Sequence, residues 1–378
     1  MLKNIFKDYI YPIAVFSGGM IGVGFLSLPY IAMKTGIWMM LLYFVVLTAL
    51  VITVNLVFCQ ISLKTPDFKR FPGFVGYYLG KWAKVFKVVS MILGTFGVLL
   101  AYLLVGGQFL TSVLQPYFSG DILTYVFIYF AIVSIIIYFD IKVVAKAEFW
   151  VIALLFASVF FVFVAGFSHI KLGNIFVSNA GLWSSDFFLP YGPLLFSLWG
   201  ISLIPEVEEM LIGQKKKLKT IVVISTIIAS VFYLLFVFLI LGITGSNTDP
   251  MAMTGLRSFL PDALVSVALL MGALATFAAF ITQGLIFKKT LIFDLKIKHW
   301  QAFIMTCCPP LIFFLLGLKS FIPLLSFVGG VLLGLDGIFV LLMYKKIAGP
   351  KGHPNIIIYP LSLVFLLGVI YEIIYFIK

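Results

Sequence analysis

Long apolar runs separated by short polar segments follow one another along the chain. A transmembrane helix needs about 20 predominantly apolar residues to cross the hydrocarbon core of a bilayer. Eleven runs meet this requirement, and they predict spans at about 10–33, 37–62, 85–115, 121–140, 147–168, 187–210, 220–243, 262–287, 300–318, 320–344 and 354–377. Residues 72–84 predict a short helix on the membrane surface before the third span. The first apolar stretch continues to Met33, so we interpret it as a membrane helix rather than a signal peptide.

The composition indicates that lipid, rather than water, is the solvent of this chain. Of its 378 residues, 63% are hydrophobic and 11% are charged, whereas a soluble domain has about 45–50% apolar and about 25% charged residues. These values exclude a soluble enzyme and a disordered protein. Because the segments between the runs are short, we expect one all-α polytopic transmembrane domain over residues 1–378, acting as a monomer.

The cysteines and histidines predict neither a metal site nor a cofactor. Cys59, Cys307 and Cys308 lie in apolar runs, and the three histidines lie at the ends of runs without a second ligand at metal spacing. We therefore expect no cofactor.

The basic residues are distributed unequally between the two sides of the predicted bundle. The chain has 26 basic and 14 acidic residues, a net charge of +12. Cytoplasmic loops of membrane proteins carry an excess of lysine and arginine. With the N-terminus in the cytoplasm and the C-terminus outside, all basic residues fall on the inner side except Lys34, Lys171, Arg257, Lys319 and Lys378. The charge is thus typical of a multi-pass protein of the cell membrane, and nucleic acid is not an expected partner.

Two of the predicted spans carry residues that interrupt helices. The first contains four glycines between Gly18 and Gly24, and the sixth contains Gly200 and Pro205 on either side of a serine. The two spans cross the membrane in opposite directions. Interrupted spans at matching positions of two halves are typical of inverted-repeat transporters. Ordinary packing of small residues between helices is the alternative.

The chemistry of such interruptions fits a zwitterion. The half-helix that begins after a break presents free N–H groups and a positive dipole end, which suit a carboxylate. The half-helix that ends before a break presents free carbonyl groups, which suit an ammonium group. An α-amino acid is therefore the expected ligand.

The two motifs also resemble a known family. Gly18–Tyr30, with the sequence GGMIGVGFLSLPY, resembles the first-helix signature of amino acid permeases in the amino acid–polyamine–organocation superfamily. Phe196–Met210, with the sequence FSLWGISLIPEVEEM, resembles the sixth helix of the amino acid/auxin permease and aromatic amino acid permease branches. The resemblance implies a LeuT-like fold with a five-plus-five inverted repeat. The repeats would cover about 10–168 and 187–344, and one extra helix would follow at 354–377.

The first motif implies one side of a substrate site. By the resemblance, Gly18, Gly22 and Gly24 supply backbone donors to the substrate carboxylate, and Gly19 and Ile21 belong to the same break.

The sixth span implies the other side. By the resemblance, Phe196, Ser197 and Trp199 supply carbonyl groups and walls, with Gly200 at the break. Tyr102 in the third span resembles the substrate-facing tyrosine region of the family, although a packing or interfacial role is equally open. The bulky Trp199 and the absence of an acid or base at the break favour neutral substrates.

The sequence favours protons over sodium as the coupling ion. The family's usual sodium site includes two adjacent hydroxyl residues on the eighth helix, whereas here Thr276 stands between Ala275 and Phe277. The threonine hydroxyl could instead bond to its own helix.

Among the charged residues in or beside the predicted spans, Glu206, Asp336 and Lys146 are candidates for ion coupling or gating. Glu206 and Asp336 are predicted to be the deepest acids, where burial is costly and functional roles are common. Glu372 and Lys146 lie nearer span ends, where a side chain can reach the surface. Lys146 is kept as a reserve candidate because some proton-coupled relatives place a fifth-helix lysine near the vacant sodium position.

The sequence thus predicts a proton-coupled symporter of neutral amino acids in the cell membrane, working by alternating access. A sodium-coupled symporter and a non-transporting amino acid sensor, such as a germinant receptor, are the alternatives. An enzyme embedded in the membrane is disfavoured, because no span holds a paired-acid or histidine-rich cluster.

Overall fold

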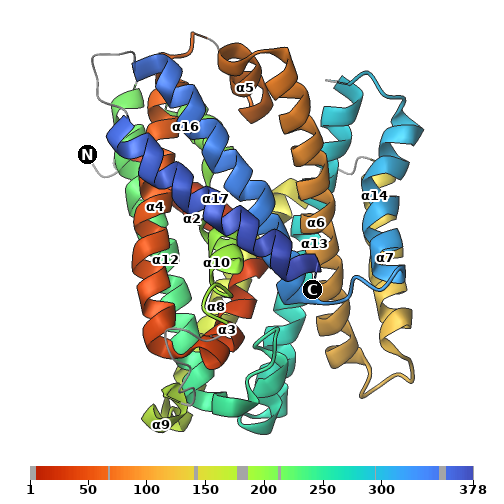
Figure 1. Cartoon of the computed structure of the whole chain (residues 1–378). Coiled ribbons are helices and arrows are strands. Elements are labelled where there is room, and N and C mark those ends of the chain that lie inside the picture. The colour runs from red at the N-terminus through yellow and green to blue at the C-terminus, as the bar shows by residue number, and fades with distance from the viewer. Residues whose placement is uncertain are drawn as a thin grey trace.

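The computed structural model describes residues 6–66, 69–139, 144–176, 186–211, 214–293, 295–348 and 355–377. In these ranges the regular structure is helical, and most helices run between two ends of one bundle (Figure 1). The helices of the first half are η1 (Phe6–Ile10), α2 (Tyr11–Met20), η2 (Val23–Ser27), α3 (Leu28–Thr35), α4 (Ile37–Lys64), α5 (Phe71–Leu79), α6 (Lys81–Leu114), α7 (Ile122–Tyr138), α8 (Val144–Gly166), η3 (Phe167–His169) and α9 (Leu172–Ile175).

The second half has the same character. Its helices are α10 (Tyr191–Leu198), η4 (Ile201–Leu203), α11 (Ile204–Met210), η5 (Lys215–Lys217), α12 (Leu218–Thr244), η6 (Gly245–Asn247), η7 (Thr254–Ser258), α13 (Asp262–Phe293), α14 (His299–Leu315), α15 (Phe321–Ser326), η8 (Phe327–Leu333), α16 (Gly334–Ala348) and α17 (Asn355–Ile377).

The eleven predicted spans each coincide with one helix or with a series of consecutive helices. By length and composition, six helices of the described chain could cross a membrane, and the bent pair Asp8–Met20 and Val23–Thr35 could form a seventh span. The other predicted spans correspond to the shorter helices α7, α8 and α14 and to the pair α10–α11. The predicted surface helix is α5, which ends at Leu79 before the third span begins.

The first span is broken where its glycines predict. The last residue of α2 is Met20, and Gly22 has an extended backbone before η2 begins. The two parts meet at an angle of 51°. Glycine costs about 1 kcal/mol more than alanine in a helix interior, so the run favours an interruption at this place.

The sixth span is broken in the same way. The short helix α10 ends at Leu198, and Trp199 has an extended backbone. Gly200 follows, and α11 begins four residues later with Pro205 in its first turn, where proline is tolerated. Both predicted breaks are therefore confirmed.

The tenth span contains a feature that its sequence did not predict. Between α15 and α16, the seven residues of η8 form a π-helix that includes Gly329 and Gly330. η8 packs against α10, and a side chain at Gly329 would overlap the carbonyl of Gly192. The π-helix thus lies directly against α10, the first half of the sixth span.

The last helix covers the bundle rather than extending it. In Figure 1, α17 crosses the front obliquely, and its C-terminal end lies near the middle of the molecule. It contacts α16, η8 and α10.

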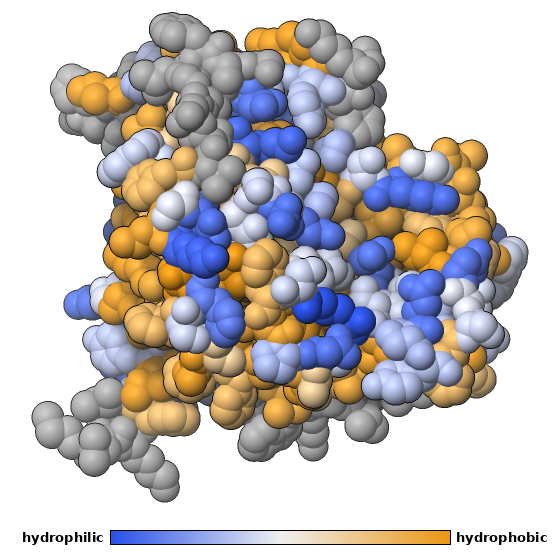
Figure 2. All heavy atoms as spheres, turned by 90° about the horizontal axis from the view of Figure 1, so that it is seen from below, coloured by the Kyte–Doolittle hydropathy of each residue, from blue (hydrophilic) through white to orange (hydrophobic). Residues whose placement is uncertain are grey.

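Polarity divides the surface as a bilayer requires. Figure 2 shows the end of the bundle that carries α9, where hydrophilic residues gather across the face and hydrophobic residues lie around its edge. In the orientation predicted from the charge distribution, this end faces the outside.

Candidate functional site

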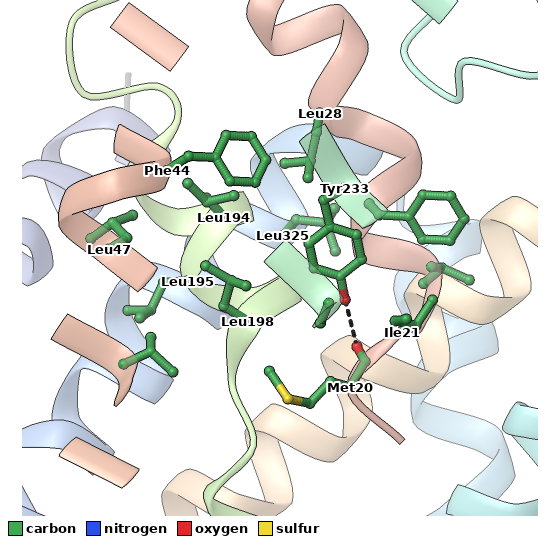
Figure 3. Packing of buried hydrophobic residues seen from close by; sticks show 14 of the residues in the cluster. Met20, Ile21, Leu28, Phe44, Leu47, Leu194, Leu195, Leu198, Tyr233 and Leu325 are labelled. Atoms are coloured by element: carbon green, nitrogen blue, oxygen red, sulfur yellow. Dashed lines mark hydrogen bonds between the residues drawn. The ribbon is translucent and has the colours of Figure 1, made fainter. Parts of the chain in front are cut away.

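The two helix breaks lie next to each other, and Tyr233 of α12 joins them. Its hydroxyl lies 2.9 Å from the carbonyl oxygen of Met20 and 2.9 Å from that of Ser197, so it donates to the last turns of α2 and α10. The ring is fully buried among leucines that include Leu194 and Leu198 (Figure 3). One hydroxyl proton is therefore shared between carbonyl groups of both interrupted helices.

Glycine is required where the two breaks touch. A Cβ at Gly24 would lie 2.5 Å from Ser197 Oγ and 2.7 Å from a ring carbon of Phe196. These contacts place Gly24 against Phe196 and Ser197, with Gly24 buried and Phe196 half-buried. Ser197 also donates to the carbonyl of Pro193 within its own helix.

A cavity opens on the other side of the first break. It has a volume of about 100 Å³, and it reaches α6, α8 and α13. The first break contributes backbone and glycine surface, and α6 contributes Tyr102 and Phe109. The described residues that line it carry no charge, and the hydroxyls among them belong to Tyr102 and Thr276.

One face of α13 is made of small residues at the cavity. Ala268, Gly272, Ala275 and Ala279 follow one another at spacings of four, three and four residues, which places them on one side of the helix. Leu155 and Val159 of α8 and Met253 complete an apolar wall. The space next to the first break therefore suits an apolar group.

The structure brings together most of the first-span residues singled out in the sequence. Gly18, Gly19, Ile21 and Gly22 line the cavity together with Tyr102 and Thr276. The Tyr102 hydroxyl points toward Gly22, 3.7 Å from where a Cβ would stand.

The sixth-span residues are placed differently. Among the described residues, Phe196, Ser197, Trp199 and Gly200 do not line this cavity. The Trp199 ring makes an edge contact with Phe365 of α17, at 6.3 Å between centroids.

The hydroxyl of Thr276 bonds to its own helix, donating to the carbonyl of Ala273 at 2.8 Å. Thr276 is buried, and its hydroxyl oxygen lies close to Gly106 of α6, 2.7 Å from where a Cβ would stand. The sequence prediction that Thr276 contributes to ion coupling stays a prediction.

Asp336 is buried and paired, as a gating role would need. Both of its carboxylate oxygens accept from Lys87 of α6, at 2.6 and 2.8 Å. The lysine also lies over the ring of Phe71, 4.9 Å from the centroid. This ion pair joins the third and tenth spans at the end of the bundle that carries α5.

The prediction that Glu206 is a deep acid was wrong. The face of α11 that packs on the bundle carries Ile204, Val207 and Glu208, and helical periodicity turns Glu206 outward. Glu208 is the buried acid. It accepts a short hydrogen bond from Ser62 and pairs with Lys215 at 2.7 Å.

The expectation that Glu372 reaches the surface was also wrong. The side chain is 1% exposed, because Phe365, Val369 and Glu372 recur on the face of α17 that packs against the bundle. The spacing of these residues in the sequence is a signal that could have revealed it. The side chain of Lys146 lies outside the described residues.

Three functional candidates were missed by sequence reasoning. Tyr233 lies in an unbroken span with no marker beside it, and Lys87 had been counted only as inner-side charge. The small face of α13 could have been found from its spacing.

Solved structures share this architecture. The structure of MhsT in complex with L-phenylalanine superposes with a TM-score of 0.63 at 13% identity, covering 96% of this chain and 97% of that one. Mhp1, a nucleobase-cation-symport-1 family transporter in a closed conformation with bromovinylhydantoin bound, gives 0.61 at 16% identity, covering 97% and 90%. A mutant of the manganese transporter of Eremococcus coleocola gives 0.53 at 15% identity, covering 98% and 94%. These likenesses show a LeuT-like fold.

Sequence comparison identifies the family. No curated protein matches the chain significantly. The family model of the tryptophan/tyrosine permeases matches residues 7–374, which is nearly the whole chain. The interrupted first and sixth spans, the cavity beside them and this match agree, and the chain belongs to the tryptophan/tyrosine permease family, a multi-pass membrane family of secondary amino acid transporters.

Proposed function

We propose that the protein is a proton-coupled symporter that carries neutral amino acids with large apolar side chains across the cell membrane by alternating access. The observation that carries the proposal is the cavity beside the first break, which combines exposed backbone with an uncharged apolar wall.

The backbone of the first break would hold the substrate's charged groups. Gly22 is extended and lies between the end of α2 and the start of η2, so N–H groups of the following turn are free to donate to a carboxylate. Tyr102 is positioned to add its hydroxyl to the same group. The ammonium group would take carbonyl oxygens at the end of α2.

The apolar wall would hold the side chain. A lysine, arginine, aspartate or glutamate side chain would meet no opposite charge among the lining residues described, and burying it unpaired is costly. The small face of α13 leaves room for an aromatic ring. The printed family description, tryptophan/tyrosine permease, and a fold neighbour determined with L-phenylalanine support a substrate of this size.

The ion pair between Lys87 and Asp336 would serve as an inner gate. It ties α6 to α16 at the end that the lysine distribution assigns to the cytoplasm, and opening toward that side would separate these helices. Glu206 faces outward from α11. It could contact the Lys87–Asp336 pair only in another conformation of the protein.

Proton coupling is supported by the scarcity of hydroxyl groups on the eighth span, which is α13. Thr276 stands alone as a hydroxyl residue at its turn of α13, and its proton is given to Ala273. Sodium would have to complete its shell from backbone and water.

The test is uptake of labelled tryptophan, tyrosine and phenylalanine into proteoliposomes, with arginine and glutamate as comparison substrates. A pH gradient, alkaline inside, should drive accumulation of the aromatic amino acids without sodium. Strict dependence on sodium would refute proton coupling, and preferential uptake of arginine or glutamate would refute the cavity assignment.

Counterflow of labelled substrate separates transport from sensing. A transporter exchanges external label for internal unlabelled substrate without any gradient, whereas a sensor binds without exchange. Binding without counterflow would therefore refute the symporter.

A further inference from the structure

Three acidic side chains are buried in the described part of the chain, and they differ in their partners. Asp336 is paired with Lys87, and Glu208 is paired with Lys215. Glu372 is 1% exposed, and no ion pair reaches it from the described residues. It is thus a carboxyl that the fold buries without a cation.

The surroundings of Glu372 are built around its carboxyl. Oε1 accepts from the backbone N–H of Gly192 at 3.1 Å, in the first turn of α10. A Cβ at Gly192 would lie 2.6 Å from Oε1, and one at Gly330 of η8 would overlap the side chain of Glu372. Two helices therefore need glycine at the positions where the carboxyl approaches them.

The other carboxyl oxygen has no such partner. Oε2 of Glu372 is buried without a hydrogen bond in the described structure, and so are the hydroxyls of Ser326 and Tyr191 nearby. In the described structure, the ionisable groups close enough to interact electrostatically with Glu372 are phenols, namely Tyr43 of α4, Tyr191 of α10 and Tyr371 and Tyr375 of its own helix. A cation that could fix the carboxyl as an anion is not among them.

Such surroundings can accept both forms of the group. Burying an unpaired carboxylate is costly, so the neutral acid suits the closed site. The N–H of Gly192 and the positive end of α10 provide a partner for the anion when water reaches it. Reversible gain and loss of one proton therefore needs no other ligand.

The site is also mechanically connected to the substrate region. Its walls are α10, η8 and α17, and α10 has only eight residues. Gly192 stands in its first turn, and Ser197, whose carbonyl receives the Tyr233 bond, stands in its last. A shift of α10 against α17 would alter the carboxyl environment and the sixth-span break together.

We propose that Glu372, on the helix that follows the two repeats, is the site that binds and releases the coupling proton. This inference rests on the proposed proton symport and names its proton carrier. A proton taken from water on one side neutralises Glu372 in the closed site, and reopening on the other side returns it to water.

The decisive variant is Glu372→Gln, which keeps the shape and hydrogen bonding of the neutral acid and removes the exchangeable proton. In sodium-free proteoliposomes with a pH gradient, alkaline inside, it should lose accumulation above equilibrium while retaining counterflow. Glu209→Gln, on the exposed side of α11, is the matched control and should accumulate substrate like the parent. Gradient-driven accumulation by Glu372→Gln at the parental level would overturn the proposal.

The two proposals fail in different ways. If the parent protein itself accumulates substrate only with sodium, proton symport is refuted and Glu372 loses its assigned role. If the parent uses protons and Glu372→Gln does so too, only the carrier assignment fails.

A second variant covers the case in which Glu372→Gln does not fold. Glu372→Asp keeps the carboxyl but withdraws it from Gly192 by one methylene. Its proton-driven uptake should depend on external pH differently from the parent, with a displaced midpoint. An identical pH profile would overturn the proposal.

Discussion

Gly22 illustrates how a single residue can be important without being strained. Its backbone is extended, a conformation open to any residue, and a Cβ would meet only the Tyr102 hydroxyl at an ordinary distance. What a larger side chain would change is the space in front of the free N–H groups.

We expect Gly22→Val to abolish uptake without affecting insertion, because its methyl groups would occupy the place of the substrate carboxylate. Gly22→Ala should weaken binding less. Gly173→Ala, at a glycine with open space around it, is the control. Surface expression and uptake of labelled substrate are the measurements, and normal uptake by Gly22→Val would contradict the site.

Tyr233 predicts an effect on stability. Tyr233→Phe removes the hydroxyl shared by the carbonyls of Met20 and Ser197, at a cost of about 1–3 kcal/mol. The Met20 carbonyl keeps its bond from the Gly22 N–H, so the loss falls mainly on Ser197. The thermal midpoint in detergent should fall. Tyr191→Phe should not lower it in the same way, because the Tyr191 hydroxyl is buried without a bond. Equal midpoints for both variants would show that the shared bond adds no stability.

At the residue scale, the sequence predicted which residues interrupt a helix better than it predicted which acidic side chains are buried. Gly18, Gly19 and Gly22 line the cavity, whereas Gly24 packs against the sixth span. The depth of an acid depends instead on the helix face that its neighbours cover. Residues 206 and 208 are two positions apart, and only packing decides that the second is buried.

Among the helices, α13 determines how much room the substrate has. Ala275→Leu would fill space on its small face beside the first break, so uptake should shift from aromatic toward smaller neutral amino acids. Ala263→Leu, at an exposed position of the same helix, should leave the preference unchanged. Competition by a series of unlabelled amino acids measures the shift, and an unchanged aromatic preference in Ala275→Leu would contradict this role.

The ion pair between α6 and α16 predicts that a single variant is less stable to heat than the double variant that removes both charges. Lys87→Met leaves Asp336 buried without a cation, and breaking a buried pair costs about 3–5 kcal/mol. The double variant with Asp336→Leu should recover much of the lost thermal midpoint. Additive losses in the double variant would show that the two side chains do not depend on each other.

Element boundaries were accessible from the sequence, because each span must satisfy its backbone and present an apolar surface to lipid. The π-helix of the tenth span was not, since its apolar run looks continuous. The pair Gly329–Gly330 is a weak signal that becomes informative only when α10 is seen against it.

For the whole molecule, the predicted orientation can be tested directly. In a background with the three native cysteines replaced by alanine, Lys319→Cys should react with a membrane-impermeant maleimide on intact cells. Lys216→Cys should react only after permeabilisation. Both side chains are exposed, so access depends on the side of the membrane. The opposite pattern would invert the assigned topology.

The π-helix η8 also sets the direction of everything that follows it. A π-turn holds about one residue more than an α-turn, and one residue corresponds to roughly 100° of rotation about a helix axis. Asp336 comes only three residues after η8 ends. Deleting Gly330 would restore an ordinary helical register and rotate Asp336 away from Lys87. The deletion of a single residue would therefore break an ion pair whose carboxylate lies six positions further along the chain.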